Sequence, residues 1–263
     1  MKKYLYIFKS ELMSNISYTF DMLLGFVGYI IMIFILMTLW QYIYSDPNEL
    51  INGYTMNETI WYIIITEVLW TGLQGRKLCK KICADIKEGN ITYNLNKPYN
   101  YIEYILFNHL GDFIYRFIFV FIIGLIFGFI FLGSFPNITL LSILGVILSC
   151  LFATIINILI TTIIGLVSFF IEDAHPLYWV HSKFILILGT LFPPTFFPGI
   201  IGTIVKYSPV YASVSAPATL FVKFNLDLFL KVMIIQIFYI IILLIITHLF
   251  YRKGAKKLNV NGG

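Results

Sequence analysis

The stretch FIFVFIIGLIFGFIFLG, residues Phe117–Gly133, decides what kind of fold this chain can adopt. It contains no charged side chain, and as a helix rising about 1.5 Å per residue it would cross most of a hydrocarbon layer about 30 Å thick. A second run of the same kind, VMIIQIFYIIILLIITHLFY, covers Val232–Tyr251. Of the 263 residues, 59% are hydrophobic and 12% are charged, whereas an average soluble domain is about 25% charged. The composition therefore predicts an all-α polytopic membrane protein.

Hydropathy predicts six transmembrane helices in one domain covering residues 1–263. The predicted spans are Asp21–Tyr44, Thr59–Gly75, Asn108–Gly133, Ile138–Ile171, Leu177–Phe192 and Leu226–Tyr251. The fourth is too long for one upright crossing and should tilt or kink, and the fifth is short. The N-terminus shows no short apolar region followed by a small-residue cleavage site, so we expect no cleaved signal peptide.

Most of the 18 lysines and arginines lie in three segments, residues 1–20, 76–98 and 252–257, while residues 44–58 contain none. The positive-inside rule then places both termini and the 76–98 loop in the cytoplasm of a cell-membrane protein. The net charge of +5 is therefore an orientation signal, and we expect membrane lipid rather than nucleic acid as the surrounding partner.

Residues 1–20 have the periodicity of an amphipathic helix. Leu5, Phe8 and Leu12 recur three or four residues apart, and lysines occupy other positions. This pattern predicts a helix lying in the membrane interface with its lysines toward the headgroups.

The loop at residues 76–98 has a second such pattern. Leu78, Ile82 and Ile86 recur every four residues among charged side chains, which predicts a surface helix with one apolar stripe. The stripe can dock into a groove of a partner, or it can rest on the membrane surface; periodicity favours neither. Gly89 fits the position after a helix end, where a positive φ is usual.

Residues 193–225 are too apolar for a free loop, yet they contain five prolines. Proline removes a backbone donor and disrupts a continuing helix, but it is favourable in a first helical turn. We therefore expect one short helix from Pro198 through Val205, and another from Pro209 or Pro217 toward Phe221. Together they would form a re-entrant hairpin on the outer side. A structured outer loop without a gating role is the alternative.

Polar and ionisable side chains inside the predicted spans are candidates for a transport pathway, because each is costly in hydrocarbon. Glu67 lies near the middle of the second span and should face protein or a wet pathway, or be protonated. Asp112 and Arg116 are four residues apart in the third span and can pair along their helix, the alternative being a role facing substrate. Asn157 in the fourth span can bond across helices.

The segment EGNITYNLNKP, Glu88–Pro98, resembles a signature that follows the second span of ABC-2-type permeases, the membrane subunits of ATP-binding cassette exporters. That signature reads Gly-x-Ile-x-x-x-Leu-x-(Arg/Lys)-Pro, and its matches are Gly89, Ile91, Leu95, Lys97 and Pro98. The outer segment is similar to the family's proline-rich pattern between spans five and six. It matches at Phe192, Pro193, Phe197, Pro198, Pro209, Pro217 and Ala218.

The resemblance implies a cytoplasmic coupling helix in the 76–98 loop that contacts an ATPase subunit. It also implies an outer gate that would involve Pro193, Pro194, Phe197, Pro198, Pro209 and Pro217. Two permease subunits, identical or different, would face each other above two nucleotide-binding subunits. Glu172 and Asp173, in a short predicted cytoplasmic turn, are candidates for a second and smaller docking site.

Enzymatic motifs are missing from the sequence. No Gly-x-x-x-x-Gly-Lys-(Ser/Thr) loop is present to hold phosphates, so ATP and magnesium should bind to the partner subunit and no cofactor to this chain. The four histidines form no zinc motif. Cys79 and Cys83 are four residues apart, a weak metal signal, and we interpret them as packing residues; no metal site is predicted.

These observations predict the permease subunit of an ATP-driven exporter. A stand-alone channel or an ion-coupled secondary transporter is the alternative, although no internal repeat of the kind common in such carriers is seen. An assembly or anchoring protein without transport is a third possibility. The sequence does not identify the substrate.

Overall fold

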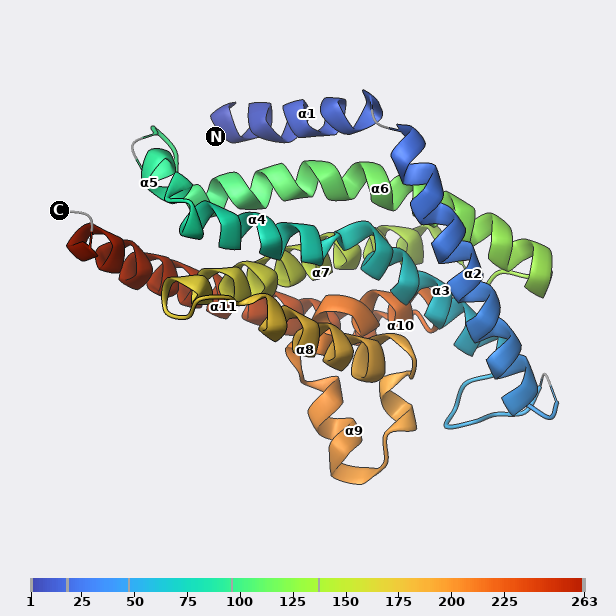
Figure 1. Cartoon of the computed structure of the whole chain (residues 1–263). Helices are drawn as coiled ribbons and strands as arrows, with labels where there is room; N and C mark the ends of the chain where they lie inside the picture. The colour runs from blue at the N-terminus through green and yellow to red at the C-terminus, as the bar shows by residue number, and fades with distance from the viewer. Residues whose placement is uncertain (1, 18, 47, 96, 137, 262–263) are drawn as a thin grey trace.

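Helices make up the regular elements in the described part of the chain (Figure 1). The computed structural model describes residues 2–17, 19–46, 48–95, 97–136 and 138–261. The α-helices are α1 (Lys2–Ser17), α2 (Thr19–Ile43), α3 (Met56–Leu73), α4 (Gly75–Lys87), α5 (Asn90–Leu95), α6 (Tyr101–Leu132), α7 (Leu140–Leu166), α8 (His175–Ile185), α9 (Gly199–Lys206), α10 (Ala216–Val222) and α11 (Leu226–Asn261). Short 3-10 turns lie at Val167–Phe169 and Pro194–Phe196, and π-helical turns at Leu186–Thr190 and Tyr211–Ser215. The all-α prediction is confirmed for these residues.

Four of the described helices are long and apolar enough to cross a membrane. They cover Gly25–Ile43, Tyr101–Leu132, Leu140–Phe169 and Leu226–Lys257, and they match the first, third, fourth and sixth predicted spans. The second and fifth predicted spans correspond to α3 and to α8 with its π turn, which do not meet the same criteria of length and apolarity. The six-span topology therefore stays a prediction.

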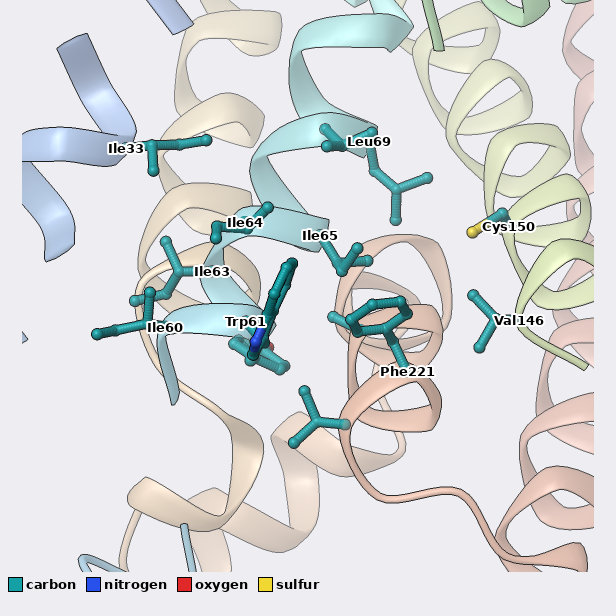
Figure 2. Packing of buried hydrophobic residues seen from close by; sticks show 14 of the residues in the cluster. Ile33, Ile60, Trp61, Ile63, Ile64, Ile65, Leu69, Val146, Cys150 and Phe221 are labelled. Atoms are coloured by element: carbon teal, nitrogen blue, oxygen red, sulfur yellow. The ribbon is translucent and has the colours of Figure 1, made fainter. Parts of the chain in front are cut away.

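Helix α3 occupies the centre of the bundle. Trp61, Tyr62 and Ile64 are each at most 1% exposed. The Trp61 ring lies 5.6 Å from that of Phe221 on α10, and Cys150 of α7 belongs to the same buried cluster (Figure 2). Because lipid tails are as apolar as these side chains, close packing rather than release from water holds such a helix in place in a membrane.

Two glycines on α6 allow this close packing. A Cβ on Gly128 would lie 2.5 Å from the Trp61 ring, and one on Gly124 would come within 3.1 Å of Ile64. Small residues four apart on one face are the usual way for transmembrane helices to approach closely. The α3–α6 contact therefore depends on these two positions.

The N-terminal helix predicted over residues 1–20 is present as α1, but it packs against α6. The rings of Tyr4 and Phe107 stack at 5.5 Å, and the Asn108 amide donates to Glu11 at 2.6 Å. Leu5, expected on the apolar face, is 57% exposed. The location of α1 at a membrane interface stays a prediction.

The chain after α8 has the helices predicted for the hairpin. Helix α9 begins at Gly199 directly after Pro198, and α10 carries Pro217 in its first turn. Helix α9 stands away from the bundle (Figure 1), and its Ile200 is 75% exposed. Residues 211–218 are all buried. The second arm of the hairpin therefore runs inside the bundle, while insertion into a membrane stays a prediction.

Candidate functional site

Helix α4 leaves α3 at a sharp joint. Gln74, between the two helices, has φ 45° and ψ 36°, the left-handed conformation typical of a helix end. A Cβ on Gly75 would lie 2.7 Å from the Tyr178 hydroxyl, so glycine allows α4 to pass close to α8. On the other side, Nε2 of His109 on α6 lies 2.5 Å from the carbonyl oxygen of Leu73. The direction of α4 is thus fixed by α6 and α8.

The apolar stripe of α4 faces the interior of its own chain. Leu78, Ile82 and Ile86 are 3%, 0% and 6% exposed. Ile82 contacts Gly165 of α7, where a Cβ would lie 2.8 Å from the Ile82 Cβ. The stripe therefore packs against other helices of the same chain, while contact of α4 with an ATPase subunit and its position at the membrane surface stay predictions. Periodicity identified the buried face but not what covers it.

The signature segment after α4 is folded back onto the same cluster. Gly89 has φ 74°, which confirms the positive φ predicted after the helix end. Ile91 is 0% exposed and packs in the cluster that contains Ile82. Lys97 lies with its Nζ 5.7 Å above the Tyr99 ring. The exposed Pro98 accepts a hydrogen bond at its carbonyl from Lys3. The side chain of Leu95 lies outside the described residues.

The two segments predicted to dock a partner meet in one groove. A pocket of about 380 Å³ lies between the end of α4, the turn from α7 to α8, and the C-terminal part of α11. It is lined by Ile86, Lys87, Ser168, Phe169, Ile171, Glu172 and Lys257; we call this the coupling groove. Nζ of Lys87 lies 4.0 Å from Oδ1 of Asp173 at its edge. The groove lies at the end of the molecule that carries both chain termini (Figure 1).

Two lysines that line this groove were not predicted as site residues from the sequence. Lys87 and Lys257 were interpreted only as orientation charges, and the Nζ of Lys257 lies 5.6 Å above the ring of Phe170. Their positions far apart in the chain gave no signal that they line one groove. Glu172 and Asp173, which were predicted as docking residues, are exposed there.

The buried carboxylate of Asp112 on α6 pairs within its own helix and also contacts an exposed lysine at the base of α4. Nε of Arg116 lies 3.1 Å from Oδ1 of Asp112, and Nζ of Lys77 on α4 lies 4.0 Å from the same oxygen. The predicted pairing of Asp112 with Arg116 along their helix is confirmed. The contact with Lys77 was not indicated by the sequence, and it links Asp112, a pathway candidate, to α4.

The other two pathway candidates are buried in different parts of the bundle. Glu67 is 4% exposed and its Oε1 has no hydrogen-bond partner among the described residues. Asn157 is 3% exposed, and its Nδ2 has no partner there either. The interhelical hydrogen bond expected from this amide donor is therefore not formed. Among the described residues, no ion pair or hydrogen bond joins Glu67, Asp112 and Asn157 to one another.

The prolines at the end of α8 leave two carbonyl groups without helical donors. Pro193 and Pro194 have no N–H, and they occupy the positions four residues after Gly189 and Thr190. Helix α3 supplies a replacement at Gly189, to which Tyr62 donates its hydroxyl at 2.6 Å. Ser215 of the second π turn also donates to Gly189, at 3.1 Å. The Thr66 hydroxyl lies 3.4 Å from the carbonyl of Thr190, although it donates at 2.9 Å to Ile63 of its own helix. At Gly189, therefore, protein donors replace the one that proline removes, as hydrocarbon requires.

Aromatic rings enclose the segment that follows. Trp40 of α2 lies with its ring centroid 6.0 Å from Phe192 and 5.5 Å from Phe196, and Phe197 lies 6.1 Å from Phe192. Of the predicted gate prolines, Pro193, Pro194 and Pro217 are buried, Pro209 is half-buried and Pro198 is exposed. The structure thus gathers most of these residues against α2, α3 and α10.

Long apolar helices around a buried central helix define a helical membrane protein. The family model described as "ABC-2 family transporter protein" matches residues 9–262, and the chain belongs to that family. It is accordingly a membrane permease component of an ABC transporter. The family assignment predicted from Gly89–Pro98 and the proline-rich segment is confirmed. No curated protein matches the sequence.

Proposed function

We propose that the chain is the permease subunit of an ATP-driven exporter and that the coupling groove receives a separate nucleotide-binding ATPase subunit. The observation that carries this proposal is the meeting of two distant segments in one groove, with Lys87 beside Asp173 and with Glu172 and Lys257 in its wall. Exposed charges of both signs around an apolar floor suit a polar, reversible protein contact.

In the proposed topology, α3 and α8 with its π turn complete six spans, and both termini and the groove face the cytoplasm. The lysine-rich segments near the groove support this orientation. The hairpin at residues 193–225 then closes the outer side. Two permease subunits, as copies or as different chains, form the pathway between them.

A movement of the ATPase would be transmitted to the spans through packed helices. A push at the groove moves α4, which contacts α7 through Ile82 and Gly165 and is joined to α3 at Gln74. At its other end, α3 holds the hairpin through Tyr62 and Gly189. Packed elements of this kind transmit displacement because they cannot deform continuously. ATP binding would thereby open the route beneath the hairpin.

ATP and magnesium would bind to the partner, since this sequence has no phosphate-binding loop. Glu67, Asp112, Arg116 and Asn157 remain the candidates for contact with substrate. Glu67, Asp112 and Asn157 each have a buried polar atom without a hydrogen-bond partner in the described chain. Of these, Glu67 fits best as an ionisable contact, because no ion pair among the described residues engages it, whereas Asp112 is engaged by Arg116 and Lys77.

The test is coexpression with a candidate nucleotide-binding ATPase subunit from the same genome, followed by copurification and measurement of ATP hydrolysis. Glu172→Lys and Lys257→Glu should each weaken the association about tenfold, which corresponds to about 1.4 kcal/mol. Lys206→Glu on α9 is the matched control, because Lys206 is also exposed but lies outside the groove; it should leave binding unchanged. Equal binding by all variants would reject the groove as the docking site.

The alternatives give different results in the same preparations. Flux driven by an ion gradient in proteoliposomes that lack the ATPase would indicate a channel or secondary transporter. An assembly or anchoring protein would give a different result: no candidate substrate would stimulate ATP hydrolysis by the complex, and the complex would transport no candidate substrate.

A further inference from the structure

Two thiols lie together on the buried face of α4. Cys79 and Cys83 are one helical turn apart, their Sγ atoms are separated by 4.0 Å, and the side chains are 0% and 6% exposed. Ala174 and Tyr178, from the turn before α8 and from α8 itself, pack against them. Both cysteines are free.

The surroundings favour a thiolate at Cys83. Its sulfur accepts a hydrogen bond from the Ser168 hydroxyl at 3.0 Å. The Cys79 sulfur lies 4.0 Å from the same atom, so a thiol and a hydroxyl both face the Cys83 sulfur as possible donors. The thiolate is the form that ligates metals. Ser168 also lines the coupling groove, so the pair lies directly behind a wall that solvent reaches.

The separation of the sulfurs fits a bridging ion better than a disulfide. A disulfide needs about 2.05 Å between the sulfurs, so one turn of α4 would have to distort to close the 4.0 Å gap. Two metal–sulfur bonds of about 2.3 Å can together span up to about 4.6 Å, so one ion can reach both sulfurs at their separation of 4.0 Å. An ion can thus bridge the two sulfurs without moving the helix.

The number of ligands selects the class of ion. The described residues bring no third histidine, cysteine or carboxylate to the pair, whereas structural zinc sites are almost always four-coordinate. Soft thiolates favour Cu(I), which accepts two or three ligands. The geometry points to a two-thiolate site at Cys79 and Cys83 for a soft monovalent ion of the Cu(I) class. Binding releases the thiol protons to solvent, leaves one negative charge on the bis-thiolate complex and changes no oxidation state.

A competition experiment on the full-length chain tests this site. The purified protein, reduced and kept anaerobic in detergent, is titrated against the Cu(I) complex of bicinchoninate, whose colour reports the copper that remains. The wild type should withdraw one Cu(I) per chain. Cys79→Ser and Cys83→Ser should bind at least about 100-fold more weakly, since loss of a supporting contact alone costs about 10- to 100-fold. Ser168→Ala, which removes only such a contact, should cost about tenfold.

Cys150→Ser is the matched control, because Cys150 is equally buried but lies on α7 outside the pair. It should bind as the wild type does. X-ray absorption of the copper-loaded wild type should show two sulfur neighbours, and this measurement decides the matter if the serine variants fail to fold. Equal copper binding by the Cys79→Ser and Cys83→Ser variants, or a copper environment dominated by nitrogen and oxygen, would overturn the proposal. None of these measurements needs the ATPase, so they are independent of the proposed function.

Discussion

Ile82 on α4 lies directly against the backbone of Gly165 on α7, with 2.8 Å between the Ile82 Cβ and the position that a Cβ on Gly165 would take. Ile82 is 0% exposed, and no side chain separates the two helices at this point. A displacement of α4 must therefore displace α7, one of the four helices long and apolar enough to cross a membrane. Direct packing couples the groove to the apolar bundle.

Gly165→Ala should separate these helices. The added methyl group overpacks the contact, which typically costs about 1–3 kcal/mol, so the thermal unfolding midpoint in detergent should fall. Gly28→Ala on α2 is the matched control, because nothing lies within 4 Å of its added Cβ. Its midpoint should stay equal or rise slightly, since alanine favours helices. A Gly165→Ala variant as stable as the wild type would show that α4 is not fixed on α7.

The sequence was sufficient to predict those parts of the fold that the membrane environment or backbone geometry dictates. Hydrocarbon permits little besides helices, so the apolar run at Phe117–Gly133 could only be helical. Gly89 was predictable because the residue after a helix end commonly needs a positive φ. The prolines likewise predicted where α9 begins, although not that Tyr62 would replace the donors they remove.

The sequence was insufficient where distant segments meet. The stripe containing Ile82 was visible as a pattern, but a pattern defines a face and not its neighbour, and Gly165 lies far along the chain. Lys87 and Lys257 carried no sign of a shared groove for the same reason. Cys79 and Cys83 were visible as a spacing; the 4.0 Å separation of their sulfurs and the contact with Ser168 needed the structure.

Tyr62→Phe should weaken the junction between α3 and the hairpin. It removes a donor from Gly189, whose helical donor position is occupied by Pro193, and a lost hydrogen bond of this kind costs about 0.5–1.5 kcal/mol. Adding Ser215→Ala removes the second donor to Gly189. The double variant should therefore lose more stability than the two single variants lose together. Tyr42→Phe, at an 88% exposed tyrosine, should change nothing. Thermal unfolding of the wild type, the Tyr62→Phe and Ser215→Ala single variants, the double variant and Tyr42→Phe measures this, and strict additivity would contradict the shared role.

Asp112→Ala should destabilise the protein by about 3 kcal/mol, because it leaves Arg116 without its carboxylate in a largely buried site. The double variant, Asp112→Ala with Arg116→Ala, should recover part of the lost stability. A double-mutant cycle by thermal unfolding should then give a coupling energy of about 0.5–3 kcal/mol. Asp227→Ala, at an exposed position on α11, should be neutral. Unchanged stability combined with lost transport would instead assign Asp112 to the pathway.

Thr195→Cys and Ser208→Cys test the orientation of the hairpin. The three native cysteines are buried, whereas Thr195 is exposed and Ser208 is half-buried, so introduced thiols there should react first. An impermeant maleimide added to intact cells should label both variants. Lys80→Cys on the exposed side of α4 should be labelled only in inverted vesicles, because the lysine-rich segments are expected in the cytoplasm. Labelling of the hairpin variants from the cytoplasmic side alone would reverse the topology and remove the hairpin as an outer gate.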